Sequence, residues 1–373
     1  MKIYKVAIVG CGKVAKKHLK AIKKSKELEL LAVCDTNKDA ANKLLSDVGI
    51  PNAPVLASLD ELISMVDNGK LVKPDIIAIT VPSGLHYGMA KTCILNNINV
   101  LLEKPMTMSS SEARELYELS KSTGIKIAMG HIYRYFPLVD VIRQDIANGV
   151  FGKITHGTIS VRWGHGQDYY DSAAWRGTWK SDGGALMNQS IHAVDLLLWL
   201  MGSNPVDVTA TIRKQLRNIE AEDLGSAIMT LENGSLAILE GTTATRPNNQ
   251  EACFSIFGEK GSISLGLRRK IPFIKILDEN NHSKNMKYIM KEFKQNGLSY
   301  YKNATNPHAS IYMDFVDALN NDRNPRADAL SGFISVDTLM GIYKSSRDKT
   351  HVALPLAENF STMDMSGYFD SKE

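Results

Sequence analysis

A glycine-rich hexapeptide near the start of the chain has the spacing of a phosphate-binding loop. Residues 10–15 read Gly-Cys-Gly-Lys-Val-Ala and stand between an apolar run at 5–9 and a helical pattern at 14–24. The first glycine permits a tight turn, the second lets the backbone approach a pyrophosphate, and Ala15 lets the helix pack closely on a sheet. The first N–H groups of a helix have no partner within it, so they can bind phosphate oxygens. The hexapeptide therefore predicts a dinucleotide site.

Asp35 is placed to distinguish two dinucleotides. It follows a second apolar run at 28–34. A carboxylate at the end of that strand accepts hydrogen bonds from ribose hydroxyls and repels a 2′-phosphate. The next residues, 36–38, include no arginine, although Lys38 could attract a phosphate. The sequence therefore predicts NAD as the cofactor in preference to NADP.

Alternating strands and helices must hold these residues in place. Further strands are expected at 75–80, 98–102 and 125–129, and helices at 38–48, 58–66, 84–96 and 109–123. Apolar strands that alternate with helices are typical of a parallel sheet covered on both faces. We expect a doubly wound Rossmann domain, an α/β fold, over residues 1–130.

The pattern changes after about residue 150, where short strands follow one another. The expected strands are 154–162, 206–213, 223–231, 235–242, 252–258 and 262–265, with turns in ENGS at 232–235 and GEKGS at 258–262. Helices are expected at 185–201, 308–320 and 330–347, and the polar segment 279–306 is expected to be a loop. We expect an α+β domain over residues 131–373, with a mostly antiparallel sheet, helices on one face, and last helices that can pack back on the first domain.

Composition narrows the class of protein. The chain has 373 residues, of which 44% are hydrophobic and 23% charged, as in a globular protein of two domains. The net charge of +4 is spread along the chain, so no nucleic-acid partner is expected. No apolar run is long enough for a membrane helix, and the N-terminus is expected to be a strand rather than a signal peptide. Four scattered cysteines favour the cytoplasm, and isolated histidines at 131, 156 and 165 suggest no metal site.

Several short motifs occur in a characteristic order. They are Thr80-Val81-Pro82, His86, Glu103-Lys104-Pro105, Gly152-Lys153-Ile154, the segment 183–202 and Asp314-Phe315. With the glycine loop, they make the chain resemble the glucose–fructose oxidoreductase / inositol dehydrogenase (Gfo/Idh/MocA) family over essentially its whole length. The resemblance implies an enzyme that transfers hydride between a nicotinamide ring and a sugar or cyclitol carbon bearing a hydroxyl group.

The resemblance also implies catalytic roles. Lys104 matches the family's catalytic lysine, Pro105 its usually cis proline, and His192 its active-site histidine. Many members carry an aspartate four residues before that histidine, where this chain has Asn188. A histidine can take the hydroxyl proton near neutral pH, and a lysine can stabilise the developing alkoxide. On a regular helix Asn188 and His192 share a face, so the amide is expected to orient the substrate or the histidine.

The remaining site residues are expected around this pair. Expected cofactor contacts are Gly10, Gly12, Lys13, Val14, Asp35, Thr80, Pro82, His86, Glu103, Lys104, Trp175 and Arg176. Expected substrate contacts are Lys104, Arg162, Tyr169, Arg176, Asn188 and His192. The stretch 162–179 is rich in Trp, Tyr and Arg, which stack on rings and pair with anionic groups.

The substrate is open to three interpretations. WRGTWK at 175–180, followed by GGALMNQSIHAVDLL, resembles the branch that oxidises nucleotide-linked sugars such as UDP-N-acetylglucosaminuronate at the 3-hydroxyl. The alternatives are a dehydrogenase of free sugars or of myo-inositol-type cyclitols, and a non-catalytic cofactor-binding sensor. In each case we expect a homodimer or homotetramer formed through the sheet of the second domain.

Overall fold

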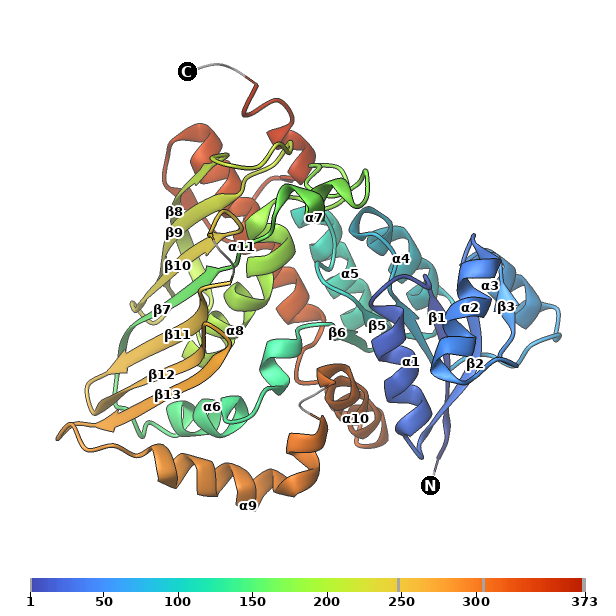
Figure 1. Cartoon of the computed structure of the whole chain (residues 1–373), viewed down its shortest axis with the longest axis horizontal. Coiled ribbons are helices and arrows are strands. Elements are labelled where there is room, and N and C mark those ends of the chain that lie inside the picture. The colour runs from blue at the N-terminus through green and yellow to red at the C-terminus, as the bar shows by residue number, and fades with distance from the viewer. Residues whose placement is uncertain (1, 247–248, 304–305, 371–373) are drawn as a thin grey trace.

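The N-terminal part of the chain folds around a parallel sheet (Figure 1). The computed structural model describes residues 2–246, 249–303 and 306–370, with residues 299–303 described for their backbone alone. Six strands lie in the order β3-β2-β1-β4-β5-β6, and each neighbouring pair is parallel. Their bounds are β1 Tyr4–Val9, β2 Leu28–Cys34, β3 Val55–Leu56, β4 Ile76–Ile79, β5 Asn99–Leu102 and β6 Ile127–Met129. The strand order reverses between β1 and β4, where open α/β sheets bind ligands.

Helices connect these strands, and most begin with a side-chain cap. They are α1 Ala15–Lys24, α2 Lys38–Val48, α3 Leu59–Asp67, α4 His86–Leu95 and α5 Ser110–Thr123, with a short 3-10 helix, η1, at Ser83–Leu85. Asn37, Ser58 and Ser109 accept hydrogen bonds from the first turns of α2, α3 and α5. Helix α1, which follows the glycine loop, has no side-chain cap. No side chain therefore competes with a ligand at this end of the helix, although the N–H groups of Ala15 and Lys17 donate to the carbonyls of Gly12 and Val14. The expected Rossmann domain is confirmed.

The second domain is built on an eight-stranded sheet. The order is β13-β12-β11-β7-β10-β9-β8-β14, and only β7 and β10 pair in parallel. The bounds are β7 Ile154–Arg162, β8 Pro205–Arg213, β9 Leu224–Leu231, β10 Leu236–Thr242, β11 Glu251–Gly258, β12 Gly261–Arg268, β13 Ile271–Asp278 and β14 Val352–Ala353. The mostly antiparallel sheet is confirmed. β12 is longer than expected, and β13 was not expected because this edge strand contains Pro272 and shows little alternation of burial.

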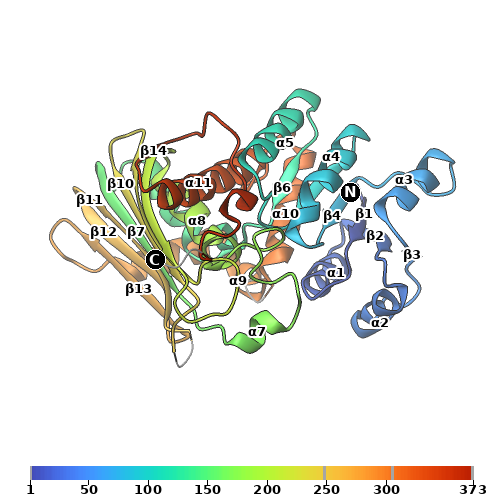
Figure 2. The same ribbon diagram turned by 90° about the horizontal axis from the view of Figure 1, so that it is seen from above.

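The helices of the second domain are α6 Val139–Ala147, α7 Gln167–Asp171, α8 Ile191–Met201, α9 Asn285–Asn303, α10 Pro307–Asn320 and α11 Ala329–Asp348, with short helices η2 Ile132–Tyr135, η3 Ala185–Ser190 and η4 Thr362–Met365. Helices α8, α9 and α11 pack on the sheet. Figure 2 shows α8 and α11 between the sheet and the first domain, while no helix of the described residues lies on the opposite face of the sheet. None of the helices in the described ranges is long and apolar enough to cross a bilayer.

The expected loop at 279–306 is wrong, because α9 occupies most of it. Only one side of this helix is buried, through Tyr288 and Glu292. Met286, Met290 and Phe293 are exposed, and a kink at Gly297 divides the helix. The polar composition and the glycine therefore conceal the helical pattern in the sequence.

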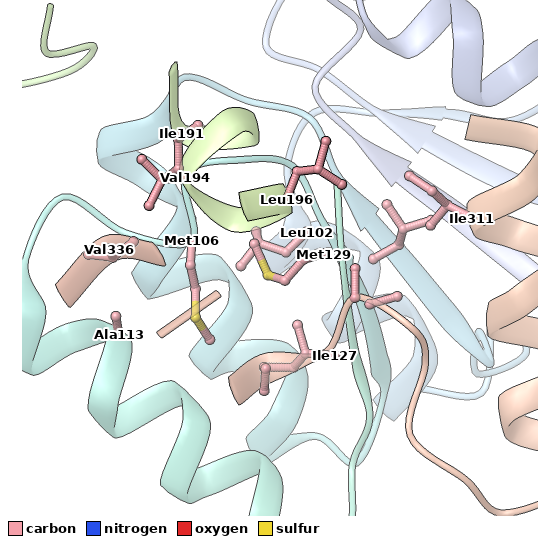
Figure 3. Packing of buried hydrophobic residues seen from close by; sticks show 14 of the residues in the cluster. Leu102, Met106, Ala113, Ile127, Met129, Ile191, Val194, Leu196, Ile311 and Val336 are labelled. Carbon is pink, nitrogen blue, oxygen red and sulfur yellow. The ribbon is translucent and has the colours of Figure 1, made fainter. Parts of the chain in front are cut away.

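A single core joins the two domains (Figure 3). Leu102 of β5 and Met129 of β6 lie in the same cluster as Ile191 of α8 and Val336 of α11. Helix α10 packs on α1, and α11 packs on α5. The backbone N–H of Met129 also donates to Ala327 at 2.8 Å. The end of β5 and the start of α8 are therefore held in a fixed relation.

Candidate active site

The glycine loop has the geometry that a pyrophosphate requires. Gly10 has a φ of +93°, and a Cβ there would lie 2.8 Å from the side chain of Val81. A Cβ on Gly12 would meet open space, so its backbone is accessible. The Thr80 hydroxyl donates to the carbonyl of Gly10 at 2.5 Å and fixes the turn. With Val14 at the uncapped start of α1, the loop fits the phosphates of a dinucleotide.

Asp35 stands at the edge of this loop. Its two carboxylate oxygens accept from the backbone N–H groups of Cys11, at 2.6 Å, and Asn37, at 2.8 Å. These bonds orient a half-buried carboxylate beside the glycine loop. Lys38, the cation that could favour NADP, begins α2 and is exposed. The residues present therefore fit the ribose of NAD.

Lys104 extends from the end of β5 into the space beside α8. The Lys104–Pro105 bond is cis, as the resemblance implies. The Lys104 ammonium donates to the carbonyl oxygen of Asn188 at 2.7 Å. Burial lowers the pKa of Lys104, and the charges of Asp182 and Glu103 only partly oppose this effect. The lysine is therefore better able to exchange its proton than a surface lysine.

His192 lies close enough to Lys104 for their charges to interact. Burial, followed by the charge of Lys104, holds the pKa of His192 well below its ordinary value. The His192 ring stacks on Tyr133, with centroids 5.0 Å apart, and meets the ring of His131 edge-on at 6.2 Å. Nδ1 of His192 is buried with no hydrogen-bond partner among the described residues. The structure thus brings together a neutral imidazole and an ammonium group from different domains.

Glu103 is directed into the protein by two histidines that sequence analysis missed. Its Oε1 accepts from Nε2 of His18 and from Nε2 of His308, both at 3.0 Å, and Nδ1 of His18 lies 3.1 Å from the hydroxyl of Tyr312. Burial alone would raise the pKa of Glu103, but the two hydrogen bonds hold it well below its ordinary value. The three side chains are close enough to hold a metal ion, yet hydrogen bonding accounts for their arrangement. Glu103 therefore anchors the segment that carries Lys104.

His86 has both ring nitrogens engaged by backbone. Nδ1 lies 2.6 Å from the carbonyl oxygen of Pro105, and Nε2 lies 3.0 Å from that of Val81. Pro82 precedes the short helix η1 in the same loop. In this geometry His86 supports the loop after β4, and its expected contact with the cofactor stays a prediction.

The start of the expected helix at 185–201 is a π-helical turn, η3, and only 191–201 is α-helical. The backbone and side chain of Glu222 accept from the N–H groups of Ala185 and Leu186, both at 2.8 Å. A Cβ on Gly184 would lie 2.1 Å from the Glu222 carbonyl oxygen, so only glycine permits this approach. The wider turn means that Asn188 and His192 do not follow regular α-helical spacing, and π-turns frequently occur at functional sites.

Asn188 is held by a carboxylate that sequence analysis did not identify. Its side-chain N–H₂ group donates to Asp182, while its Oδ1 accepts from Gln189 at 2.7 Å. Asp182 is buried, and it also accepts from the N–H of Gly177 at 2.9 Å. Since its charge raises the pKa of Lys104, Asp182 places a carboxylate beside the lysine although position 188 is an amide.

Two expected substrate residues lie next to this group. The Arg176 guanidinium donates to the hydroxyl of Tyr169 at 2.5 Å and lies over the rings of Tyr169 and Trp175, at 4.3 and 4.6 Å. Gln189 donates to the same hydroxyl at 3.4 Å. Arg176 is also close enough to lower the pKa of Lys104. Tyr169, Trp175 and Arg176 are thus gathered around the catalytic candidates.

Arg162 lies elsewhere. It follows Val161, which points into the core, so its side chain lies on the sheet face without helices. Its guanidinium donates to Glu240 and to Glu251, at 2.7 and 2.6 Å. The structure therefore does not bring Arg162 together with Lys104 and His192, because the alternation of a strand directs it to the opposite face.

An open cleft of about 1250 Å³ runs from the glycine loop to residues 164–169. Its cationic lining residues are Lys13, Arg217 and Arg246, against one carboxylate, that of Asp168. Arg217 is 5% exposed, and its Nε has no hydrogen-bond partner among the described residues. Sequence analysis missed Arg217 and Arg246, because nothing near them in the sequence indicates that they face the glycine loop. The lining favours an anionic ligand.

Comparison with known proteins decides the family. Residues 4–131 match the oxidoreductase family with an NAD-binding Rossmann fold, and residues 139–264 match the GFO/IDH/MocA C-terminal domain. The chain belongs to the Gfo/Idh/MocA family of oxidoreductases. Membership makes it an enzyme with an NAD-binding domain, related to sugar dehydrogenases.

Among family members of known sequence, the UDP-N-acetylglucosamine 3-dehydrogenase of Acidithiobacillus ferrooxidans is 26% identical, over 65% of this chain and 68% of its own. The D-glucoside 3-dehydrogenase of Escherichia coli is 24% identical, over 94% of this chain and 97% of its own. These relatives act on different sugars, so membership of the family does not by itself define the substrate.

Two solved structures are similar over almost the whole chain. The WlbA dehydrogenase from Bordetella pertussis, in complex with NADH and UDP-GlcNAcA, is 30% identical with a TM-score of 0.83, over 95% of this chain and 99% of its own. The WlbA dehydrogenase from Chromobacterium violaceum, with the same two ligands, is 30% identical with a TM-score of 0.82, over 96% of this chain and 98% of its own.

Proposed function

We propose that this oxidoreductase uses NAD to oxidise a hydroxyl group of a nucleotide-linked sugar, and that its substrate is of the UDP-N-acetylglucosaminuronate type, oxidised at the 3-hydroxyl. The observation that carries the proposal is the cationic cleft that runs from the glycine loop to Tyr169, whose hydroxyl accepts hydrogen bonds from Arg176 and Gln189. Lys13, Arg217 and Arg246 line it, and Arg217 is buried with an unsatisfied Nε. A diphosphate would supply the missing acceptors. The two WlbA structures, which hold UDP-GlcNAcA, support this choice.

His192 is the proposed base. Its lowered pKa keeps the imidazole neutral at physiological pH, so it can accept the hydroxyl proton of the substrate. Tyr133 supports one face of the ring. When NAD is bound, its nicotinamide supplies the acceptor for the hydride. Lys104 is placed to donate a hydrogen bond to the oxygen that becomes negative, in a site where burial strengthens that interaction.

Asn188 and Asp182 are proposed to position this pair. Asp182 holds the Asn188 amide, and the Asn188 carbonyl accepts from Lys104. Tyr169 and Arg176 are proposed to contact the sugar or its carboxylate, and Trp175 to lie near the nicotinamide. On the cofactor side, Gly10, Gly12, Lys13 and Val14 would surround the phosphates, Asp35 would bind the ribose, and Thr80, Pro82 and His86 would support the loop.

We also propose that the reaction takes place in a reducing compartment. All four cysteines are free, and Cys34 and Cys93 are buried, which suits a reducing compartment such as the cytoplasm. The family relationship leaves the non-catalytic sensor without support. A dehydrogenase of free sugars or cyclitols is the remaining alternative, but a neutral substrate would leave Arg217 and Arg246 without an anion.

The test is a substrate comparison. NADH formation would be measured with UDP-GlcNAcA, UDP-GlcNAc, glucose, N-acetylglucosamine and myo-inositol, in single-turnover as well as steady-state assays. We expect oxidation to depend on the UDP group. Arg217→Gln should raise the KM for the UDP-sugar about 10-fold or more, because it removes a charge-assisted contact. Arg162→Gln, on the opposite face of the sheet, is the matched control. Equal or better activity on a free sugar or inositol would refute the nucleotide-sugar proposal.

A further inference from the structure

We propose a second binding site, for small phosphate-type or carboxylate anions, in a cavity beside α8 that is separate from the cleft. The cavity has a volume of about 290 Å³ and is lined by arginines from three separate segments: Arg134 of η2, Arg143 of α6, and Arg326, which precedes α11. Trp199 of α8 and Asn204 also line this cavity. None of these residues lines the cationic cleft.

Arg143 carries the unbalanced charge of this cavity. Arg134 forms a two-point pair with Asp195, at 2.8 and 2.7 Å, and Arg326 lies 3.5 Å from Asp140. Within the described ranges, no carboxylate forms an ion pair with Arg143. Its guanidinium lies 5.9 Å from the ring of Trp199, which Arg134 also faces at 5.1 Å. An arginine stays charged in proteins, so a half-buried cation borders the cavity without an anion.

The other polar groups of the cavity wall do not balance the positive charge of Arg143. Asp328 is the remaining acidic residue of the lining, and it caps α11 by accepting from the N–H of Ser331 at 3.0 Å. Burial raises the pKa of Asp328, which weakens its negative charge. The side-chain amide of Asn204 has no hydrogen bond within the described part of the chain, so it offers a second donor. An anion entering the cavity would meet donors with spare capacity.

A structural role for Arg143 is the competing explanation. Nη2 of Arg143 lies 3.1 Å from the position that a Cβ would take on Gly202, next to the C-terminal end of α8. A cation there interacts favourably with the helix dipole. This role explains where Arg143 lies, but within the described ranges no protein group accepts a hydrogen bond from the guanidinium. A bound anion satisfies them, and planar guanidinium groups match carboxylate and phosphate geometry.

The size of the cavity limits the ligand class. Pockets for drug-sized ligands start at about 300 Å³, so this cavity fits a single phosphate group or a short carboxylic acid rather than a nucleotide sugar. The cavity is linked to the active site through intermediate residues. Asp195, the partner of Arg134, lies on the same helix as His192 and is 3.7 Å from His131, whose ring faces His192.

The experiment uses the full protein saturated with NAD, so that the pyrophosphate site is filled. Inorganic phosphate and, separately, succinate are titrated by isothermal calorimetry into the parent protein and four variants, one of which is Arg143→Lys. Arg143→Gln removes the unpaired cation, Arg217→Gln alters the cleft, and Arg269→Gln removes an exposed arginine in the turn after β12. We expect one of the two anions to bind the parent, and Arg143→Gln to weaken its affinity about tenfold or more. Arg217→Gln and Arg269→Gln should retain that site.

Three results would overturn the proposal. They are the absence of binding to the parent, an unchanged Kd in Arg143→Gln, and loss of binding in Arg217→Gln alone, which would assign the anion to the cleft. Arg143→Lys keeps the charge but not the planar fork, so intermediate affinity in this variant supports the site. Unchanged NADH binding and circular dichroism in each variant would show that the fold is intact. The anion that binds, phosphate or succinate, identifies the ligand class.

Discussion

His192 and Lys104 are the residues on which the proposed chemistry depends most directly. We expect His192→Ala to lower kcat by roughly 10²–10⁴, the range of general acid–base catalysis, with little change in NADH affinity. Lys104→Ala should also lower kcat. Lys104→Met should not restore it despite its similar length, and Lys104→Arg should remain poor because its charge is placed differently. Steady-state NADH formation and fluorescence titration of NADH measure the two effects. Full turnover in both alanine variants would remove these residues from the mechanism.

The pH dependence of kcat/KM should reflect the burial of the same pair. The pKa of His192 lies well below 6.5, so the loss of activity on the acid side should occur below that pH. The pKa of Lys104 is below 10.5, and loss of its proton should limit the alkaline side earlier than for an exposed lysine. Asp182 raises the pKa of Lys104, so Asp182→Asn should move the alkaline limb to lower pH. Asp171→Asn, on the exposed helix α7, is the control. An unmoved alkaline limb in Asp182→Asn would argue against this positioning role.

Asp35 should determine the choice of cofactor. Its carboxylate, fixed by the Cys11 and Asn37 N–H groups, would face the 2′-phosphate of NADP. We expect the native protein to bind NAD more tightly than NADP, and Asp35→Ser to narrow the difference. Fluorescence titration with NADH and NADPH tests this. Tighter binding of NADPH by the native protein would show that Asp35 has been misassigned.

Residue roles could be read from the sequence where a motif is continuous. The glycine loop and the segment carrying Lys104 were found because each is a short run of neighbours. His18 and His308 were missed because their partner, Glu103, comes from a distant segment. Asp182 was missed because Lys104, whose pKa it raises, also lies far from it in the sequence. Arg162 was expected in the substrate site because the sequence does not show which face of a strand becomes covered.

At the scale of elements, the π-turn η3 depends on the carboxyl group of Glu222, whose pKa is raised by burial. Burial raises the pKa of Glu222 from 4.5 to about 7, so folding is favoured by its protonated form. This stability is fully present below the unfolded pKa and is lost as pH rises through about 7. A pKa that differs by one between the folded and unfolded states corresponds to about 1.4 kcal/mol of stability. Glu222→Gln keeps the acceptor for Leu186 without the charge, so its stability relative to the parent should increase between pH 5 and 8. Denaturant unfolding at several pH values measures this, and a difference independent of pH would contradict it.

Elements with strong periodicity were predicted closely, and those shaped by tertiary contacts were not. Strand β7 has the expected bounds, and α1 and α5 differ by one residue. The π-turn could not be predicted, since it is imposed by Glu222 on a neighbouring segment. Helix α9 was missed because its exposed Met and Phe side chains break the usual relation between apolar residues and burial.

At the scale of the whole molecule, the sheet face without helices should be covered by another copy. Ile228 and Leu236 are exposed on that face, at 52% and 41%, beside the ion pairs of Arg162. We expect a dimer or tetramer, measured by light scattering at micromolar concentration. Ile228→Lys should shift the assembly toward smaller species, whereas Leu95→Lys, at an exposed site on the first domain, should not. A monomeric parent protein would contradict this prediction.

The single core shared by the two domains has a consequence for synthesis on the ribosome. Helix α1 needs α10 to cover it, and the hydroxyl of Tyr4 in the first strand donates to Asn320 at 2.7 Å. Ser110, at the start of α5, donates its backbone N–H to Phe360 at 2.9 Å. The N-terminal domain is therefore translated first but lacks part of its covering until the C-terminal segment has left the exit tunnel. During that interval the nascent chain exposes apolar surface, so the cell's chaperones should bind this domain early and release it only when translation ends.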